Sequence, residues 1–504
     1  MDTGYDFNMH PFRTINVTLL CWAFLHSLSA AEIRVPDDHI RIQEAIDAAG
    51  PGDRILVSPG NYRETIVLKP GIHIRSIGSD ERGKHGLKRA EATIIDGGGE
   101  SGGSPGVTMA EGATLDGFTV TGVGRYDAIR WQKHWDEKGE NQSHEHIGHF
   151  GTPGIAIIGV TCTVINNVVH HNGDTGIAIR GVEGQRCVPI ISGNVCYRNM
   201  GGGIGSMNDS MAVIERNACF ENFFAGIGHN GASPLVIRNE CYRNIRAGIG
   251  ISEGAKPTVR KNRCYENRRA GIGIRTGEAT SPLIEDNDCH DNEMAGIGCD
   301  EKATPIIRRN RCYRNKLAGI GCQGGSSPVI IDNHCHENEA AGIGADSANP
   351  LILRNHLEKN HTAGIGIRGE SKTNIVGNTC LDNRLVAVGI RDGAEAFLQG
   401  NVLVRATGMP PMIAILGDSK AVLSGNTIRG GGIAGVMVEG RLDAIANHIE
   451  GQNGGSGILL KENSNATLAG NQISGFRVPI NDQNTKPAND RDQSEDPEKK
   501  NADC

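Results

Sequence analysis

Apolar and polar positions recur along most of this chain in a unit of 22 to 25 residues. Its most regular part is a Gly-Ile-Gly tripeptide. The central isoleucines are Ile204, Ile227, Ile249, Ile272, Ile297, Ile320, Ile343 and Ile365. A fixed period of this length is typical of stacked repeats, in which each unit buries its apolar face against its neighbours. The pattern therefore predicts a solenoid.

The unit from 248 to 270 contains short alternating runs broken by Gly, Pro and Asn, which favour strands and turns over helices. Ile249 and Ile251 are expected to face one side of a strand, and Val259 and Cys264 to continue the interior. Equivalent positions in parallel rungs lie about 4.8 Å apart. The aliphatic and Cys columns should fill the core, while two Asn columns should bond from rung to rung. Both glycines of each Gly-Ile-Gly are expected to point outward, along a flat track.

These repeats resemble the right-handed parallel β-helix repeat family, which has the pectin-lyase-like fold of many sugar-active enzymes. The resemblance implies an all-β chain, a single-stranded right-handed parallel β-helix. The stretch from Ile40 to Gly50 reads as a short amphipathic helix ending in Gly, which would cap the N-terminal end. Residues 53–58 and 65–68 read as the first strands.

The ends of the chain differ from the repeats. Thr14–Ala31 is a short apolar run ending in small residues, so residues 1–31 are predicted to be a signal peptide, with Met1 or Met9 as the start. Residues 32–480 form the predicted β-helix, and residues 481–504 a disordered polar tail. No other stretch could span a membrane. We expect a secreted or periplasmic monomer.

The charge and the cysteine content limit the partners and the disulfide bonds that we expect. With a net charge of −7, the chain lacks the excess of basic residues that is typical of nucleic-acid-binding proteins, so we expect no nucleic-acid partner. Fourteen cysteines in an exported protein suggest disulfides. A disulfide requires a Cβ–Cβ distance near 3.8 Å, however, whereas equivalent cysteines on neighbouring rungs are about 4.8 Å apart and their Cβ vectors are parallel. We therefore expect free buried thiols, with Cys504 on the tail as the reactive one.

The largest departure from the repeat is the insertion Tyr126–Gly151, which contains two of the three Trp. Long loops on a rigid scaffold commonly carry function. Trp131 and Trp135 could stack on sugar, and His146 could contact it. His134 and Glu145 are candidates for acid–base catalysis. The alternative is a purely structural role, in which the insertion is a lid that packs its Trp residues on the solenoid.

The same insertion contains the pattern His-Glu-His-x-x-His. His144, His146 and His149 could present imidazoles to zinc or copper, although their spacing matches no established metal motif. Similar β-helix repeats occur in a periplasmic accessory family of nitrous oxide reductase, linked to copper supply. A metal is therefore the one cofactor left open, and no other is expected.

The glycine track offers a second candidate site. Asp300 and Asp346 are expected on this face two rungs apart, about 9.6 Å, near the upper end for an inverting carboxylate pair. Arg275 and Arg368 flank them and could bind an acidic sugar. A third column, from Tyr197 to His336, should stack its rings one rung apart. The alternative for the track is an ordinary solvated face, and the rings of the third column could also face a sugar chain.

The sequence thus favours an exported β-helix that binds a polysaccharide. Lyase, hydrolase or epimerase activity stays open, because the acidic and Asp-Pro-His motifs of the pectate lyases, polygalacturonases and mannuronan epimerases that share the fold are absent. The alternatives are a non-catalytic surface or structural repeat protein and a periplasmic metal-handling accessory protein.

Overall fold

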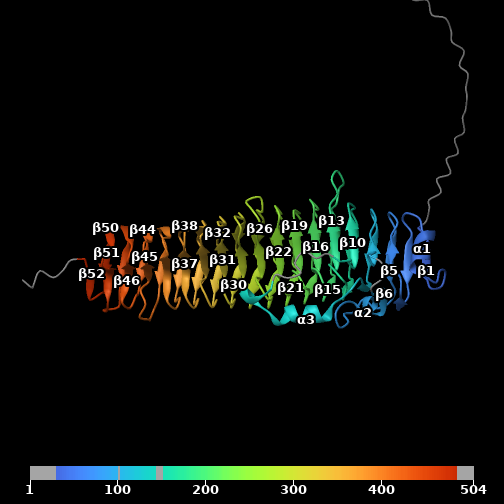
Figure 1. The fold of residues 1–504 in the computed structure, drawn as a ribbon, viewed down its shortest axis with the longest axis horizontal. Helices are drawn as coiled ribbons and strands as arrows, with labels where there is room; N and C mark the ends of the chain where they lie inside the picture. The colour runs from blue at the N-terminus through green and yellow to red at the C-terminus, as the bar shows by residue number, and fades with distance from the viewer. Residues whose placement is uncertain (1–29, 100–102, 144–150, 485–504) are drawn as a thin grey trace, which may run out of the picture.

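The computed structural model of the chain describes residues 30–99, 103–143 and 151–484. Its 52 strands form three parallel sheets of 18, 17 and 17 strands, which wind along one axis with β1 (Glu32–Val35) at one end and β52 (Val478–Asp482) at the other (Figure 1). The predicted parallel solenoid is confirmed. Its last strand ends two residues past the predicted boundary at 480, whereas residues 1–29 and 485–504 of the predicted signal peptide and tail lie outside the described residues.

One turn shows how the unit folds. Strand β22 (Ile249–Ser252) belongs to sheet C, β23 (Thr258–Arg260) to sheet A and β24 (Arg263–Tyr265) to sheet B, after which β25 (Ile272–Ile274) returns to sheet C. Each strand pairs in parallel with its equivalents in the neighbouring turns. Because the strands are only three or four residues long, turn residues separate every strand from the next. The unit is therefore all strand and turn, as its alternation predicts.

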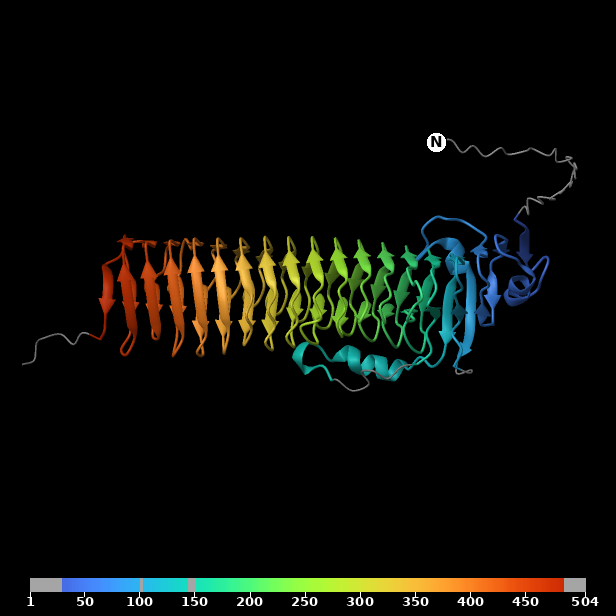
Figure 2. The same cartoon turned by 90° about the horizontal axis from the view of Figure 1, so that it is seen from above.

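The helices lie outside this stack. Helix α1 (Ile42–Ala48) covers the N-terminal end as predicted, and the carboxylate of Glu64 accepts hydrogen bonds from the backbone N–H groups of Ile42 and Gln43 at its first turn. Helix α2 (Lys88–Ala92) lies between β5 (His73–Ser76) and β6 (Thr93–Gly99). Figure 2 shows that α3 (Ala128–Asp136) runs alongside the stack.

The interior consists of columns that repeat in register. Ile249 and Ile251 of sheet C, Val259 of sheet A and Cys264 of sheet B are all 2 % exposed or less. The cysteine column runs in register through Cys196, Cys219, Cys241, Cys264, Cys289, Cys312 and Cys335. All of these thiols are free, as expected, and burial raises the pKa of Cys219 and Cys241 far above the usual range. The column therefore acts as packing.

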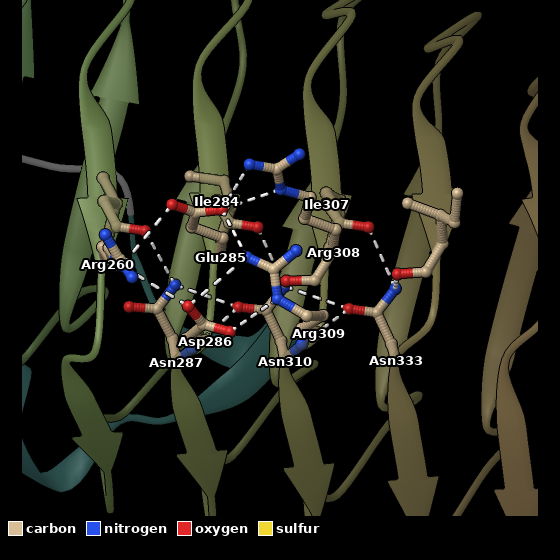
Figure 3. Close-up of polar contacts among 12 residues, drawn as sticks. Arg260, Ile284, Glu285, Asp286, Asn287, Ile307, Arg308, Arg309, Asn310 and Asn333 are labelled. Carbon is tan, nitrogen blue, oxygen red and sulfur yellow. Dashed lines mark hydrogen bonds and ion pairs between the residues drawn. The ribbon is translucent and has the colours of Figure 1, made fainter.

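Buried asparagines join the rungs at two corners. In the first column, Asn310 Oδ1 accepts from both the backbone N–H and the side-chain amide of Asn287 at 3.0 and 2.9 Å, and Asn310 repeats this with Asn333 (Figure 3). Asn310 Nδ2 also donates to the Ile284 carbonyl at 3.0 Å. Each amide thus bonds to the rungs on both sides. The left-handed backbone belongs to the residue before each Asn, as at Arg309 (φ 53°), and not to the Asn itself.

The two glycines of each Gly-Ile-Gly have different roles, which corrects the expectation that both point outward. A Cβ on Gly248 would lie 2.7 Å from the Gly271 carbonyl oxygen and 2.8 Å from Asn267 Nδ2. A Cβ on Gly250 would meet only the Cβ of Ala225, at an ordinary 3.4 Å. Only the second glycine therefore borders the outer face, while the first permits close packing at the Asn corner.

This difference predicts unequal effects of the same substitution. Gly248→Ala should destabilise the chain by about 1–3 kcal/mol, because backbone and a buried Asn must move to admit the methyl group. Gly250→Ala, two residues away in the same turn, should change stability by less than about 0.5 kcal/mol. Urea denaturation of both variants tests this. Equal shifts of the midpoint would show that the corner tolerates a side chain.

Within the described residues, one imidazole, that of His229, takes a place in the aliphatic core of the stack. His229, in β19 (Ile227–Asn230), takes the inward position that Ile251 occupies one rung later, and its Nδ1 lies 2.7 Å from Ser206 Oγ. Burial lowers its pKa to about 3. The ring is therefore neutral in the folded chain at neutral pH.

This burial makes stability depend on pH. Because the unfolded imidazole titrates near 6.5, the unfolded state binds more protons below that pH, and the contribution of His229 is lost progressively as pH falls from about 6.5 toward 3. Replacing His229 by Ile should reduce the fall in the free energy of unfolding between pH 7 and pH 4. Denaturation curves at both pH values measure it. Identical pH dependence in the two proteins would contradict the assignment.

Candidate functional site

The insertion is a strap that lies over several turns of the solenoid. It leaves β9 (Thr119–Val123), forms α3 and the short helix η1 (Gly139–Asn141), and returns to β10 (Ile155–Ile158). Trp131 Nε1 donates to the Glu221 carbonyl at 2.8 Å, and the Gly139 N–H donates to the Arg268 carbonyl at 2.8 Å. Lys138 pairs with Glu293 at 3.0 Å. The strap is thus fixed to several successive corners.

Its aromatic residues anchor it. Trp131 is 3 % exposed and packs with Met200, Phe223 and Ile245 in a small apolar cluster of its own. The Trp131 ring stacks on Trp135 at 5.0 Å between centroids, and the Arg198 guanidinium lies 4.6 Å from it. Trp131 therefore packs on the solenoid, as the purely structural alternative for the insertion predicts. Sugar stacking on that ring would require the strap to leave its place.

Trp135 is partly buried and lies close to two cations. The guanidinium groups of Arg268 and Arg243 are 4.1 and 5.4 Å from its ring. His134 is fully buried, with its ring edge-on to Phe223 at 4.8 Å, which places this acid–base candidate inside the strap interface. The remaining candidates of the insertion, Glu145 and the three histidines His144, His146 and His149, lie outside the described residues.

The sequence carries a signal for the strap in the residue that follows each Asn of the second column, which runs through Asn199, Asn222 and Asn244. This residue is apolar at Met200, Phe223 and Ile245, which pack against α3. It is polar or charged in the later rungs, at Arg268, Glu293, Lys316, Glu339, His361 and Arg384. The column thus predicts the apolar part of the docking surface, whereas the strap continues over Arg268 and Glu293 through polar contacts.

The packing of α3 predicts which side chains hold the strap. Trp131→Ala should weaken its attachment by about 3–5 kcal/mol, the usual cost of removing a buried Trp. Ile129→Ala is the matched control, because Ile129 lies on the same helix and is 86 % exposed. Hydrogen exchange of residues 126–143 should accelerate only in the first variant. Similar exchange in both would mean that the strap is held by its polar contacts.

The glycine track has the predicted row of polar side chains beside it. Asp346 is in register with Gln323, which donates to Asp300 at 2.7 Å, so the two carboxylates lie two rungs apart as predicted. Asp346 pairs with Arg368 through both Nε, at 2.8 Å, and a terminal nitrogen, at 2.7 Å. Arg368 is therefore engaged with a neighbour. The catalytic and binding roles given to these residues stay predictions.

Arg275 belongs to a cluster with Arg246 and Arg269, which lies beside Gln142 and Ser143 of the strap. Arg246 is 9 % exposed, and its guanidinium donates to Gln142 Oε1 at 2.8 Å and to the Ser143 carbonyl at 2.6 Å. Burial, followed by the charges of Arg269 and Arg275, lowers the pKa of Arg246 to about 10. In the described residues, neither Arg246 nor Arg275 forms an ion pair. Glu137 and Glu140 act in the opposite direction on Arg246 and Arg269, so the acids of the strap offset part of the positive charge of the cluster.

The aromatic column on the outer face of sheet B stacks as predicted. Its rings follow one another at 4.8–5.1 Å between centroids, from His170 and Tyr197 through Phe220, Tyr242, Tyr265, His290 and Tyr313 to His336. Because the ring faces contact each other, they present edges to solvent and cannot stack on a sugar along the column. Burial lowers the pKa of His170 to about 4. The column is therefore a structural feature of sheet B.

Residues 153–282 and 271–403 match the family model for a right handed beta helix region, over the turns just described. The chain is a right-handed parallel β-helix. No curated protein matches its sequence. Among the described residues of this β-helix, no helix has the length and apolar content needed to cross a membrane.

Several solved structures align with the β-helix. The A-module of the Azotobacter vinelandii mannuronan C-5 epimerase AlgE4 is 18 % identical, with 78 % of this chain and 97 % of that chain covered and a TM-score of 0.41. The pre-mature bacteriophage phi29 gene product 12 is 13 % identical, covering 89 % and 72 %, with a TM-score of 0.44. The Streptomyces thermodiastaticus GH87 alpha-1,3-glucanase is 11 % identical, covering 88 % and 69 %, with a TM-score of 0.29. These likenesses assign no activity.

Proposed function

We propose that the β-helix binds an acidic polysaccharide, with the arginine cluster beside the strap as its recognition point. The observation that carries this proposal is the grouping of Arg246, Arg269 and Arg275, whose charges act on one another although Glu137 and Glu140 lie nearby. Guanidinium groups suit carboxylate and sulfate oxygens because they donate two parallel hydrogen bonds. Buried Arg246 is held by the strap, and exposed Arg275 is the group that a ligand meets first.

The surface beside the cluster suits a polymer. Gly273, Gly298, Gly321 and Gly344 continue the track from Gly250, and a Cβ on each of these four would meet only an alanine methyl group at 3.5–3.9 Å. The result is a level strip with a repeat of one rung. A chain of sugar units could lie along it with an acidic group near Arg275. Asp346, neutralised by Arg368, adds little repulsion.

We restrict the proposal to binding. Asp300 and Asp346 each contact a neighbouring side chain, and Gln323 lies between them in the same column. A catalytic pair would need a water or a sugar atom held between the carboxylates. Export is part of the proposal, because acidic polysaccharides are found in cell envelopes and outside cells. The apolar segment 14–31 supports export.

The test is retention of the mature chain on immobilised polygalacturonate and polymannuronate, with dextran as the neutral polymer. The double variant Arg269→Gln/Arg275→Gln should lose at least tenfold in affinity for the acidic polymers, about 1.4 kcal/mol. Arg354→Gln is the control, because Arg354 lies in an exposed ion pair with Asp332 on another face. Binding should also weaken with salt.

Two outcomes would refute this function. If neither acidic polymer retains the unaltered chain, the chain has no general affinity for acidic polysaccharides. If the double variant and Arg354→Gln bind as tightly as the parent, the polymer contacts another face, and the cluster has only a role in holding the strap.

A further inference from the structure

The outer face of sheet B carries a group of metal-ligating side chains away from the strap. Strand β33 (His334–His336) pairs with β36 (His356–Glu358), so that His334 faces His356 and His336 faces Glu358. The residues between them, Cys335 and Leu357, are fully buried. Because successive side chains of a strand alternate, all four polar residues therefore project from the same outer surface.

We propose that His334, His356 and Glu358 form a binding site for a divalent first-row transition metal, which joins two neighbouring rungs. One nitrogen from each imidazole and one carboxylate oxygen lie within 4.8 Å of one another. Two histidines and one carboxylate are a recurrent ligand set for zinc and for non-haem iron and related metals. Three protein ligands leave further positions for water or a ligand atom.

The separations suit a common metal centre. His334 Nε2 lies 3.3 Å from Glu358 Oε1, and His356 Nε2 lies 3.5 Å from Glu358 Oε2. Ligand atoms about 2.1 Å from an ion are themselves about 3.0–3.4 Å apart in octahedral or tetrahedral geometry. His334 Nε2 is shielded from solvent, and the Glu358 carboxylate is its partner in the structure. A metal between these two groups would bind both with little movement.

His336 stands beside this group. Its ring lies 4.7 Å from that of His334, and its Nε2 accepts from Arg311 Nε at 3.4 Å.

A second His-x-Glu strand in the same sheet shows what is special here. In β48 (His448–Glu450), His448 Nε2 lies 3.9 Å from Glu450 Oε2. The residues in register with His448 on the two neighbouring rungs are Thr427 and Gln472, so no second imidazole completes the set. An isolated pair of this kind is an ordinary surface contact. The proposed site depends on two imidazoles from adjacent rungs.

The test of the site is Co²⁺ binding to the mature chain. The protein carries no histidine tag and is first freed of metal with a chelator. We expect one Co²⁺ per chain, with a visible absorption band that Zn²⁺ displaces. His356→Gln and Glu358→Gln should each weaken Co²⁺ binding at least about 100-fold. His448→Gln should leave it unchanged. All three positions are on the surface, so circular dichroism without metal should be identical in every variant.

The histidines of the insertion provide the discriminating variant. If His144→Gln/His146→Gln/His149→Gln abolishes Co²⁺ binding while Glu358→Gln retains it, the metal binds in the strap and the proposal is wrong. Absence of any Co²⁺ binding by the parent chain also overturns it. An anomalous zinc peak between β33 and β36 in crystals would confirm the position. None of these results depends on the polysaccharide, because the arginine cluster and the metal site are tested by different ligands.

Discussion

The structure depends on the side-chain amides of the buried asparagines. At each corner, one Asn oxygen accepts two hydrogen bonds from the Asn of the preceding rung, and the Asn nitrogen donates to that rung and to the next. A shift of one residue between rungs would leave these buried groups unpaired, at a cost of about 1–3 kcal/mol each. Corners of this kind recur through most of the stack. They therefore fix the register on which every other column depends.

The sequence predicts the columns well because they are a one-dimensional property. Once the period is known, residues with the same position in the unit must lie above one another, so the cysteine core, the ring stack and the outward row from Arg275 to Arg368 follow directly. Turn geometry does not follow from the period. The close approach at Gly248 and the left-handed backbone before each Asn arise from the path of the chain around a corner.

The candidate sites could be predicted only in part, for a related reason. The insertion is visible as a break in the repeat, yet the inward orientation of Trp131 depends on three apolar residues that come from three different rungs. Arg275 is evident from its column, whereas Arg246 and Arg269 lie at the corner and join it only in three dimensions. The His334–Glu358 group does not follow from the period alone, because its members belong to two different columns.

The strap also changes how the solenoid can come apart. In a stack of repeats, each rung contacts only its neighbours, so opening can start at any point and spread from there. The strap contacts Glu221, Ile245, Arg268 and Glu293, which lie on four successive rungs, and so ties these rungs together from outside. That stretch must open as one cooperative block, whereas the rungs beyond it toward β52 can be released one by one. Opening of the strapped rungs is thus more cooperative than opening of the rungs that follow them.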